Sequence, residues 1–237
     1  MKLFLLDLGQ GLPPSLRDEW KTLADPQRRK QLSTYKDTLG ADRSLAGEML
    51  ARYALALDLR RAPSSLEFVR ADSGKPSLVA SGASSPSDAS DASGAAGAPG
   101  PPRHFSISHA GRFVACATAA TPVGVDLEVK AVKAELAPWF CHPAELALLA
   151  AAADPALLRL RLWTLKESWI KCIASGVGRH MASLDLSVFL HAAGSRTLFF
   201  TAHGFTFHSL CLPGASMAVC LQNTPDGPEA DLHPVKD

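Results

Sequence analysis

The second half of the chain contains a nine-residue stretch whose pattern decides how that half folds: Trp163-Thr164-Leu165-Lys166-Glu167-Ser168-Trp169-Ile170-Lys171. At 100° per residue, four apolar residues share one arc: Leu158, Leu162, Leu165 and Trp169. This arc predicts the core-facing side of a helix. Glu167 and Lys171 fall nearly opposite it, beside Trp163, and their order at this spacing favours an ion pair. On an arbitrary helix such a pair is usually a solvated salt bridge, so the stretch alone does not establish a site.

A second acidic stretch, Gly124-Val125-Asp126-Leu127-Glu128, lies upstream in a predicted strand over residues 123–129. Alternate residues of a strand project to the same side, so Asp126 and Glu128 share a face with their Cα atoms about 6.5–7 Å apart. A solvent-facing strand would show the same alternation. Gly124 is expected to leave that face open for a ligand. Together with Glu167, the pair offers three carboxylates without histidine or cysteine, a donor set that suits Mg²⁺.

Composition narrows the possible classes of protein. The 237 residues can form one large domain or two small ones. The formal net charge of +1 gives no basic field that would indicate a nucleic-acid or membrane partner. Five cysteines without a C-x-x-C pair indicate reduced thiols and a cytoplasmic protein, although they could equally be small buried apolar residues. No stretch approaches the roughly 18 apolar residues of a membrane span, so a soluble protein is expected.

Local signals predict a mixed order of strands and helices. The run Lys2–Gly9 is too short for a signal segment, is interrupted by Asp7, and is expected to form a first strand. Asp25-Pro26 is a typical helix start, with an N-cap acceptor followed by proline. A longer amphipathic helix is predicted over residues 42–55, with apolar positions at Leu45, Met49, Tyr53 and Leu57. Residues 66–70 alternate like a strand.

The remaining segments are predicted as follows. Residues 80–102 contain only Ala, Ser, Gly, Pro and Asp and are expected to be a disordered insertion. Residues 104–117 form two strands that meet at a turn near 109–112. Helices follow over about 144–153 and from Asp154-Pro155 to Ile173. Strand-like runs occur at 184–190, 197–201, 205–212 and 216–221, and residues 222–237 are expected to be a flexible tail.

Several residues that could hold phosphate accompany the carboxylates: Arg43, Lys75, Ser108, His109 and Lys171. The Ser-x-His pattern would suggest a serine hydrolase, but the chain has no G-x-S-x-G elbow. Carboxylates, a metal ion and cations are instead the equipment for phosphoryl transfer, where catalysis is chiefly positioning and charge neutralisation. For His109 alone, the ordinary alternative is a ring packed under a hairpin turn.

Four motifs in this order carry a resemblance to a known family: Gly74-Lys75-Pro76, Phe105-Ser106-Ile107-Ser108-His109, Gly124-Val125-Asp126-Leu127-Glu128 and Trp163–Lys171. Together they resemble the 4′-phosphopantetheinyl transferases of the surfactin-synthetase-activating type. The predicted helix over 42–55 and Asp25-Pro26 with Arg28 also resemble that family. The resemblance covers most of the chain.

The resemblance implies an α+β fold made of a pseudo-two-fold pair of similar α/β subdomains, residues 1–120 and 121–237, with the active site in the cleft between them. It implies a monomer that uses Mg²⁺ and coenzyme A. The phosphopantetheine arm would pass to a serine of an apo acyl-, peptidyl- or aryl-carrier-protein domain, with release of adenosine 3′,5′-bisphosphate. This is holo-acyl-carrier-protein synthase activity.

The same resemblance implies roles for individual residues. The metal ligands would be Asp126, Glu128 and Glu167. The coenzyme A contacts would be Arg28 and Arg43 at the 3′-phosphate, Lys75 and Ser108 at the nucleotide, and His109 and Lys171 at phosphate oxygens. Glu167 would be the general base, directly or through a metal-bound water, and Lys171 would assist the reaction. The carrier protein would dock near residues 139–145.

The chain departs from the family pattern in three places. The insertion at 80–102 lengthens the connection between Lys75 and Ser108, at a closure cost that grows only logarithmically. Four residues separate Lys171 from the Gly176–His180 loop where the family commonly has two, and Gln31 replaces a basic residue. Two other functions remain open: a homologue that binds carrier protein or nucleotide without activity, and an Mg²⁺-dependent phosphohydrolase.

Overall fold

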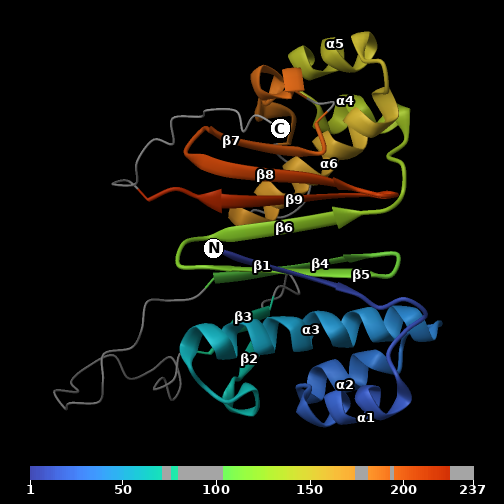
Figure 1. The fold of residues 1–237 in the computed structure, drawn as a ribbon, viewed down its shortest axis with the longest axis vertical. Helices are drawn as coiled ribbons and strands as arrows, with labels where there is room; N and C mark the ends of the chain where they lie inside the picture. The colour runs from blue at the N-terminus through green and yellow to red at the C-terminus, as the bar shows by residue number, and fades with distance from the viewer. Residues whose placement is uncertain (71–75, 80–103, 174–180, 193–194, 225–237) are drawn as a thin grey trace, which may run out of the picture.

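The computed structural model describes residues 1–70, 76–79, 104–173, 181–192 and 195–224 (Figure 1). The N-terminal half contains β1 (Lys2–Asp7), α1 (Pro14–Leu23), α2 (Pro26–Leu32), α3 (Thr38–Leu59), η1 (Pro63–Ser65), β2 (Phe68–Arg70), β3 (Pro76–Leu78), β4 (His104–Ala110) and β5 (Phe113–Ala119). The C-terminal half contains β6 (Val123–Glu128), η2 (Ala134–Leu136), α4 (Ala137–Phe140), α5 (Pro143–Ala151), α6 (Pro155–Ile173), η3 (Met181–Ser183), η4 (Ser187–Ala192), β7 (Thr197–Ala202), β8 (Phe205–Leu212) and β9 (Ala215–Gln222). In each half one strand is followed by a run of helices and then by a run of strands, and the sheets are antiparallel, which confirms the predicted α+β class.

The two halves repeat one topology. The N-terminal sheet has the strand order β1-β5-β4, and the C-terminal sheet has the order β6-β9-β8-β7, with every pairing antiparallel. The first three strands of each sheet correspond, because a long helix follows the first strand and a hairpin supplies the other two. Helices α3 and α6 each pack on their own sheet; in Figure 1 α3 runs below the N-terminal strands and α6 lies behind β8 and β9. A separate two-stranded sheet pairs β2 with β3.

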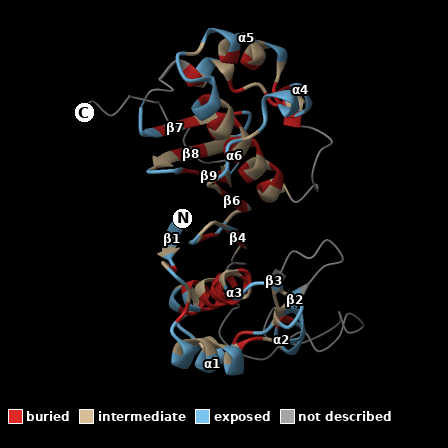
Figure 2. Cartoon of the chain, turned by 90° about the vertical axis from the view of Figure 1, so that its right-hand side faces the viewer, coloured by how far each residue is buried: buried red, intermediate tan, exposed pale blue. Residues whose placement is uncertain are grey.

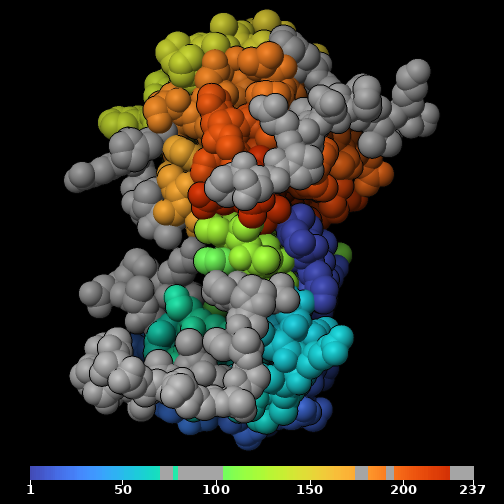
Figure 3. Space-filling view, turned by 90° about the vertical axis from the view of Figure 1, so that its left-hand side faces the viewer, coloured from blue at the N-terminus to red at the C-terminus, as the bar shows by residue number. Residues whose placement is uncertain are grey.

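The sheets meet edge to edge at the middle of the molecule. Strand β6 lies against β4 and β5, and Figure 3 shows residues from the middle of the chain, in green, at the waist between the blue and cyan N-terminal part and the orange and red C-terminal part. An apolar cluster crosses this junction, with members from β5, β6 and β9: Ala115, Ala117, Ala119, Val123, Val125, Leu127, Met217 and Val219. The alternation predicted for the strand over 123–129 therefore describes a buried face.

Two helix starts follow the predicted capping chemistry. The Asp25 carboxylate accepts a hydrogen bond from the Arg28 backbone N–H at 2.7 Å, and α2 begins at Pro26. The Asp154 carboxylate accepts from the Leu157 N–H at 2.9 Å, and α6 begins at Pro155. These caps satisfy backbone donors that have no partner inside the helix.

Of the four residues predicted to form the core-facing stripe of α3, only the first two are buried. Leu45 and Met49 are buried, but Tyr53 is 38% exposed and Leu57 is 67% exposed. A four-residue step turns a helix by about 400°, so each successive position moves about 40° further round the axis. Residues that lie on the true core-facing side of the helix, such as Ala54 and Leu55, take over the packing. Figure 2 shows buried residues concentrated on α3, while α1 presents much exposed surface.

One predicted strand is wrong, and one helix and the strand β3 were not predicted. Residues 184–190 pair with no strand, and the chain enters η4 at Ser187. The strand was predicted because Leu184, Leu186 and Leu190 are apolar; all three are buried, but not in a sheet. The short helix α4 was not predicted. The predicted tail begins too early, since Gln222 still belongs to β9. The predicted insertion at 80–102 and the Gly176–His180 loop lie outside the described residues, as does the chain from 225 onward.

None of the helices in the described ranges has both the length and the apolar character that a membrane crossing requires.

Candidate active site

Helix α6 reaches the acidic strand β6 because residue 124 is glycine. A Cβ atom at Gly124 would lie 1.9 Å from the Ser168 carbonyl oxygen and 2.5 Å from the Cys172 backbone nitrogen. The interpretation that Gly124 leaves room for a ligand is therefore wrong, since the backbone of α6 fills the space. This close approach carries Glu167 and Lys171 to the acidic side chains of β6.

A pocket of about 440 Å³ collects most of the predicted site residues. Its walls come from α2, α3, β4, β6 and α6, and so from both halves of the chain. The predicted residues that line it are Arg28, Ser108, His109, Asp126, Glu128, Glu167 and Lys171. Arg43 does not line this pocket, and Lys75 lies outside the described residues. The sequence motifs thus converge on one cavity although they are spread over 144 positions, from residue 28 to residue 171.

Lys171 contacts side chains of β6 and β4. Its ammonium lies 2.7 Å from Asp126 Oδ1 and donates to Ser108 Oγ at 3.1 Å. The Ser108 hydroxyl donates to Asp126 Oδ1 at 3.0 Å and accepts the Leu127 backbone N–H at 3.2 Å. A hydroxyl has one donor and two acceptor positions, and all are in use. In this arrangement Ser108 supports Asp126 and Lys171.

The serines of β4 also join the two sheets. Ser106 Oγ accepts the Val125 N–H at 3.1 Å, two residues before the bond that Ser108 makes to Leu127. In an antiparallel strand alternate N–H groups point to opposite edges, so one edge of β6 pairs with β9 and the other is satisfied by these hydroxyls. Ser106 was not predicted as a functional residue. Its position, two residues from Ser108 on the same strand face, was the available signal.

Arg43 lies close to the pocket without lining it. Its Nη1 donates to the Gly111 carbonyl at 2.7 Å, at the turn between β4 and β5. Its positive charge lowers the pKa of His109, together with those of Lys171 and Arg28. Desolvation is the largest cause of that lowered pKa, so the neutral form of His109 is favoured.

At the acidic end of the pocket, the pKa values of two carboxyl groups are raised. Burial raises the pKa of Glu167, the negative charge of Asp126 raises it further, and Lys171 partly offsets these effects. Burial followed by the charge of Asp126 likewise raises the pKa of Glu128. The pocket therefore has mutually repelling carboxylates on β6 and α6 and cationic groups on α2 and α6. A bound cation would relieve the repulsion at the acidic end.

The donor set at this end fits a hard divalent cation. Asp126 Oδ2 is buried and has no hydrogen-bond partner among the described residues. Within the described ranges, no three Asp, Glu, His or Cys side chains are already grouped closely enough to hold an ion. Lys171 is the cation that neutralises Asp126 in this arrangement. The three predicted ligands therefore match Mg²⁺ in oxygen chemistry and charge, and they require side-chain rotation to converge.

Six further residues line the pocket and were not predicted to do so: Ser44, Gly47, Glu48, Ile107, Leu127 and Trp163. Trp163 was placed beside Glu167 by helical spacing, but its contact with buried Phe140, at 5.1 Å between ring centroids, was not predicted. Ser44 and Glu48 are four residues apart on α3 and face Arg28 of α2. Nothing in the sequence pairs these two helices, so the contact could be found only in three dimensions.

Comparison with known proteins agrees with this site. A family model described as the 4′-phosphopantetheinyl transferase superfamily matches residues 122–220. The chain is 29% identical over 239 residues to 4′-phosphopantetheinyl transferase Sfp of Bacillus subtilis (strain 168), with 97% of this chain and 95% of the relative covered. It is 26% identical to 4′-phosphopantetheinyl transferase ffp of Bacillus subtilis over the same shares of the two chains.

A further relative, 4′-phosphopantetheinyl transferase gsp of Aneurinibacillus migulanus, is 29% identical over 154 residues, 64% of this chain and 56% of the relative. The matched segment 122–220 contains both acidic motifs of the pocket, on β6 and on α6. The relatives Sfp and ffp match along almost the whole chain, and the motifs meet in one pocket, so the chain is similar in sequence and in site to the 4′-phosphopantetheinyl transferases of the surfactin-synthetase-activating type.

Proposed function

We propose that the protein transfers the 4′-phosphopantetheine arm of coenzyme A to a serine of apo carrier-protein domains, in an Mg²⁺-dependent reaction that releases adenosine 3′,5′-bisphosphate. The names of its relatives support the transfer. The observation that carries the proposal is the division of one pocket into a basic side, with the charged Arg28 and the neutral imidazole of His109, and an acidic side with three carboxylates. A polyanionic substrate and a divalent cation match these two sides.

Hydrogen-bond donors on the N-terminal side, most of them cationic, would bind the phosphates of coenzyme A. Arg28 and His109 line the pocket, and Arg43 lies close enough to affect the pKa of His109. Lys75 completes the predicted set. A neutral His109 can still donate one hydrogen bond to a phosphate oxygen.

Asp126, Glu128 and Glu167 would hold Mg²⁺, which when bound supplies positive charge against the pyrophosphate of coenzyme A. Asp126 must then exchange its contact with Lys171, whose ammonium becomes available for a phosphate oxygen. The Asp126 carboxylate can therefore pair either with the Lys171 ammonium or with a bound Mg²⁺. In this proposal Ser108 holds Asp126 and Lys171 in register for that exchange.

The transfer is a single displacement at phosphorus. The serine oxygen of the carrier forms a bond to the phosphorus that bears the pantetheine arm, and the bond from this phosphorus to the bridging oxygen breaks. The leaving adenosine 3′,5′-bisphosphate keeps that oxygen. Glu167 accepts the proton of the serine hydroxyl, and Lys171 donates a hydrogen bond or a proton to the leaving phosphate.

The carrier protein would dock over α4, as the resemblance implies. Trp139 is 78% exposed and neighbouring Leu136 is 42% exposed, which gives an apolar surface next to the pocket-lining helix α6. Within the same segment, Phe140 and Glu145 are buried and unavailable to a partner. A monomer, a cytoplasmic setting and the division at residue 120 stay predictions.

Product analysis tests the proposal against its alternatives. An apo carrier-protein domain, coenzyme A and Mg²⁺ are incubated with the protein, and adenosine 3′,5′-bisphosphate, inorganic phosphate and modified carrier are quantified. The proposal requires equal amounts of modified carrier and adenosine 3′,5′-bisphosphate, with neither formed without carrier or with EDTA. Phosphate released without carrier would indicate a phosphohydrolase, and tight coenzyme A binding without product would indicate a binding protein.

A further inference from the structure

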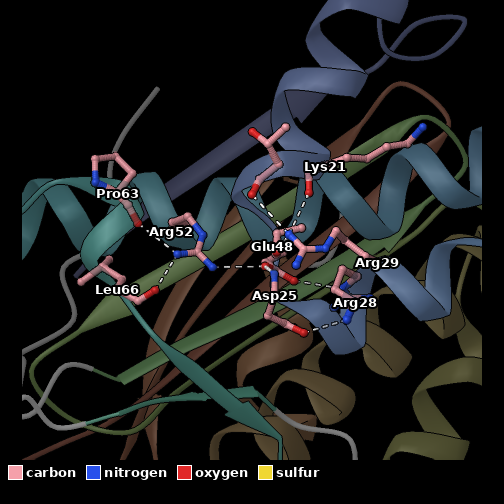
Figure 4. A network of polar contacts seen from close by, with 10 residues as sticks. Lys21, Asp25, Arg28, Arg29, Glu48, Arg52, Pro63 and Leu66 are labelled. Atoms are coloured by element: carbon pink, nitrogen blue, oxygen red, sulfur yellow. Dashed lines mark hydrogen bonds and ion pairs between the residues drawn. The ribbon is translucent and has the colours of Figure 1, made fainter.

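A buried ion-pair network lies behind one cation of the pocket (Figure 4). Glu48 on α3 accepts a hydrogen bond from Arg28 Nε at 3.1 Å and one from Arg52 Nη2 at 3.3 Å. Its two oxygens serve different partners: Oε2 takes Arg28, while Oε1 takes Arg52 and the Asp25 backbone N–H at 3.0 Å. The carboxylate therefore joins α2, which carries Arg28, to α3.

The guanidinium of Arg28 is fixed along one side and available along the other. Of its five N–H donors, Nε uses one on Glu48, and Nη1 uses two on Ser44 Oγ and Gln31 Oε1. Among the residues that the structure describes, none accepts from Nη2. The two Nη2 hydrogens are the donors that remain for a ligand of the pocket that Arg28 lines.

Arg52 keeps Glu48 from cancelling the charge of Arg28. Arg52 is anchored independently, with Nη1 donating to the carbonyls of Pro63 at 3.0 Å and Leu66 at 2.6 Å. Two guanidinium charges share one carboxylate charge, so the triad keeps one net positive charge. The geometry combines a fixed guanidinium with an uncancelled charge, which suits recognition of an anion.

We propose that Glu48 is a positioning residue that orients Arg28 for an anionic group of the substrate, which is the 3′-phosphate of coenzyme A. This inference rests on the proposed function for the identity of the ligand. An arginine held in one rotamer before binding loses less conformational entropy when the ligand arrives, so its orientation contributes to affinity. Glu48 touches Arg28 and needs no contact with the reacting atoms.

Two other roles for Glu48 predict different results. If the carboxylate only stabilises the fold, its removal affects all substrates equally. If it mainly neutralises Arg28, its removal strengthens the binding of an anion. Dephospho-coenzyme A, which lacks the 3′-phosphate, separates these possibilities because it differs from coenzyme A only at the group that Arg28 is proposed to hold.

The test compares kcat/KM for coenzyme A and dephospho-coenzyme A in the wild type, in Glu48→Gln and in a matched control, Asp42→Asn. Asp42 is also a buried carboxylate of α3 paired with an arginine, Arg17 at 2.6 Å, but it does not line this pocket. Glu48→Gln is expected to lower kcat/KM for coenzyme A about 10- to 100-fold through KM, the size of effect seen when residues that orient metal ligands from the outer shell are removed. In Glu48→Gln, kcat/KM for dephospho-coenzyme A stays close to the wild-type value. In Asp42→Asn, kcat/KM for the two substrates changes by the same factor.

Equal losses for the two substrates in Glu48→Gln, or tighter binding of coenzyme A, would overturn the proposal. If Glu48→Gln does not fold by circular dichroism, Glu48→Asp keeps the charge but shortens the side chain, and the same selective loss is expected from it in weaker form. Calorimetric titration with adenosine 3′,5′-bisphosphate and with adenosine 5′-monophosphate measures the same selectivity without catalysis. A wild type that prefers the bisphosphate but transfers nothing would contradict the proposed function while leaving the role of Glu48 testable.

Discussion

At the scale of single residues, Gly124 explains why β6 and α6 can form one site. The sequence showed a glycine beside two carboxylates, and the natural interpretation was space for a ligand. The space is taken by the Ser168 carbonyl and the backbone of α6. Sequence spacing predicted which residues share a face, but it could not show which element approaches that face.

Substitution of Gly124 by alanine is therefore expected to destabilise the protein by about 3 kcal/mol, the upper part of the range for overpacking, because the helix must move away from the strand. Urea unfolding measures the change in the free energy of unfolding. Gly204→Ala is the control: it meets no atom within 4 Å, and its φ of +80° should cost only about 1–2 kcal/mol. A tolerated alanine at position 124 would contradict the described packing.

Asp42 gives a pH dependence whose sign follows from its partners. Burial favours the protonated carboxyl, but hydrogen bonds from Arg17 and the Leu12 N–H outweigh it, so the pKa of Asp42 is lowered below its ordinary value of 3.8. A group with a lower pKa when folded stabilises the protein above the unfolded pKa and loses that contribution as the pH falls through the folded pKa.

Asp42→Asn is expected to cost about 2 kcal/mol at pH 7, because Arg17 and the Leu12 N–H lose a charged acceptor. The difference between wild type and variant should shrink as the pH falls below about 4. Unfolding free energies between pH 7 and pH 3 provide the measurement. A difference that stays constant over this range would show that the Asp42 charge is not the stabilising group.

At the scale of elements, α6 is held from both sides. On the side away from the pocket, Lys166 and Glu145 form a fully buried ion pair at 2.7 Å. Lys166 Nζ also donates to the carbonyls of Met181 and Leu184, and Glu145 Oε1 accepts the Leu186 N–H. This pair ties α5 and the segment after α6 to the helix that carries Glu167.

Lys166→Met is expected to lower the free energy of unfolding by about 3–5 kcal/mol, because it leaves Glu145 as a buried uncompensated charge. The double variant Lys166→Met/Glu145→Gln removes that charge and keeps an acceptor for Leu186, so it should be more stable than the single variant. Denaturant unfolding of both proteins is the measurement. A double variant that costs at least the sum of the two single changes would contradict the ion-pair account.

Element types were largely predictable, and the exceptions have physical causes. Capping residues at Asp25 and Asp154 and the alternation of strands gave most boundaries. The strand prediction for residues 184–190 was wrong because three buried leucines match the sequence pattern of a strand, although the segment pairs with no strand. The stripe on α3 failed because an exact four-residue spacing drifts around the helix.

At the scale of the whole molecule, the two sheets are joined partly by side chains. Ser106 and Ser108 on β4 accept the outward N–H groups of Val125 and Leu127 on β6. The motif containing Ser108 and His109 was predicted as a ligand-binding feature. Its role in joining the halves depends on a strand pairing that no local pattern encodes.

Ser106→Ala leaves the Val125 N–H without its acceptor at the junction of the sheets, and about 1–3 kcal/mol of stability should be lost. Thermal and urea unfolding measure the loss. Ser33→Ala, at an exposed hydroxyl on the C-cap of α2, should be nearly neutral. Equal stability of the Ser106 and Ser33 variants would contradict the role of Ser106 in joining the sheets.

In the proposed reaction, the pocket between the halves performs the transfer and Glu167 accepts the proton. Intact-mass spectrometry of an apo carrier-protein domain, incubated with coenzyme A, Mg²⁺ and the protein, measures it directly. Wild type and a surface control, Glu19→Gln, should add one phosphopantetheine to the carrier serine, whereas Glu167→Gln should be slower by about 100-fold or more. Modification by Glu167→Gln at the wild-type rate would contradict the account, because the acidic side of the pocket would then not perform the chemistry.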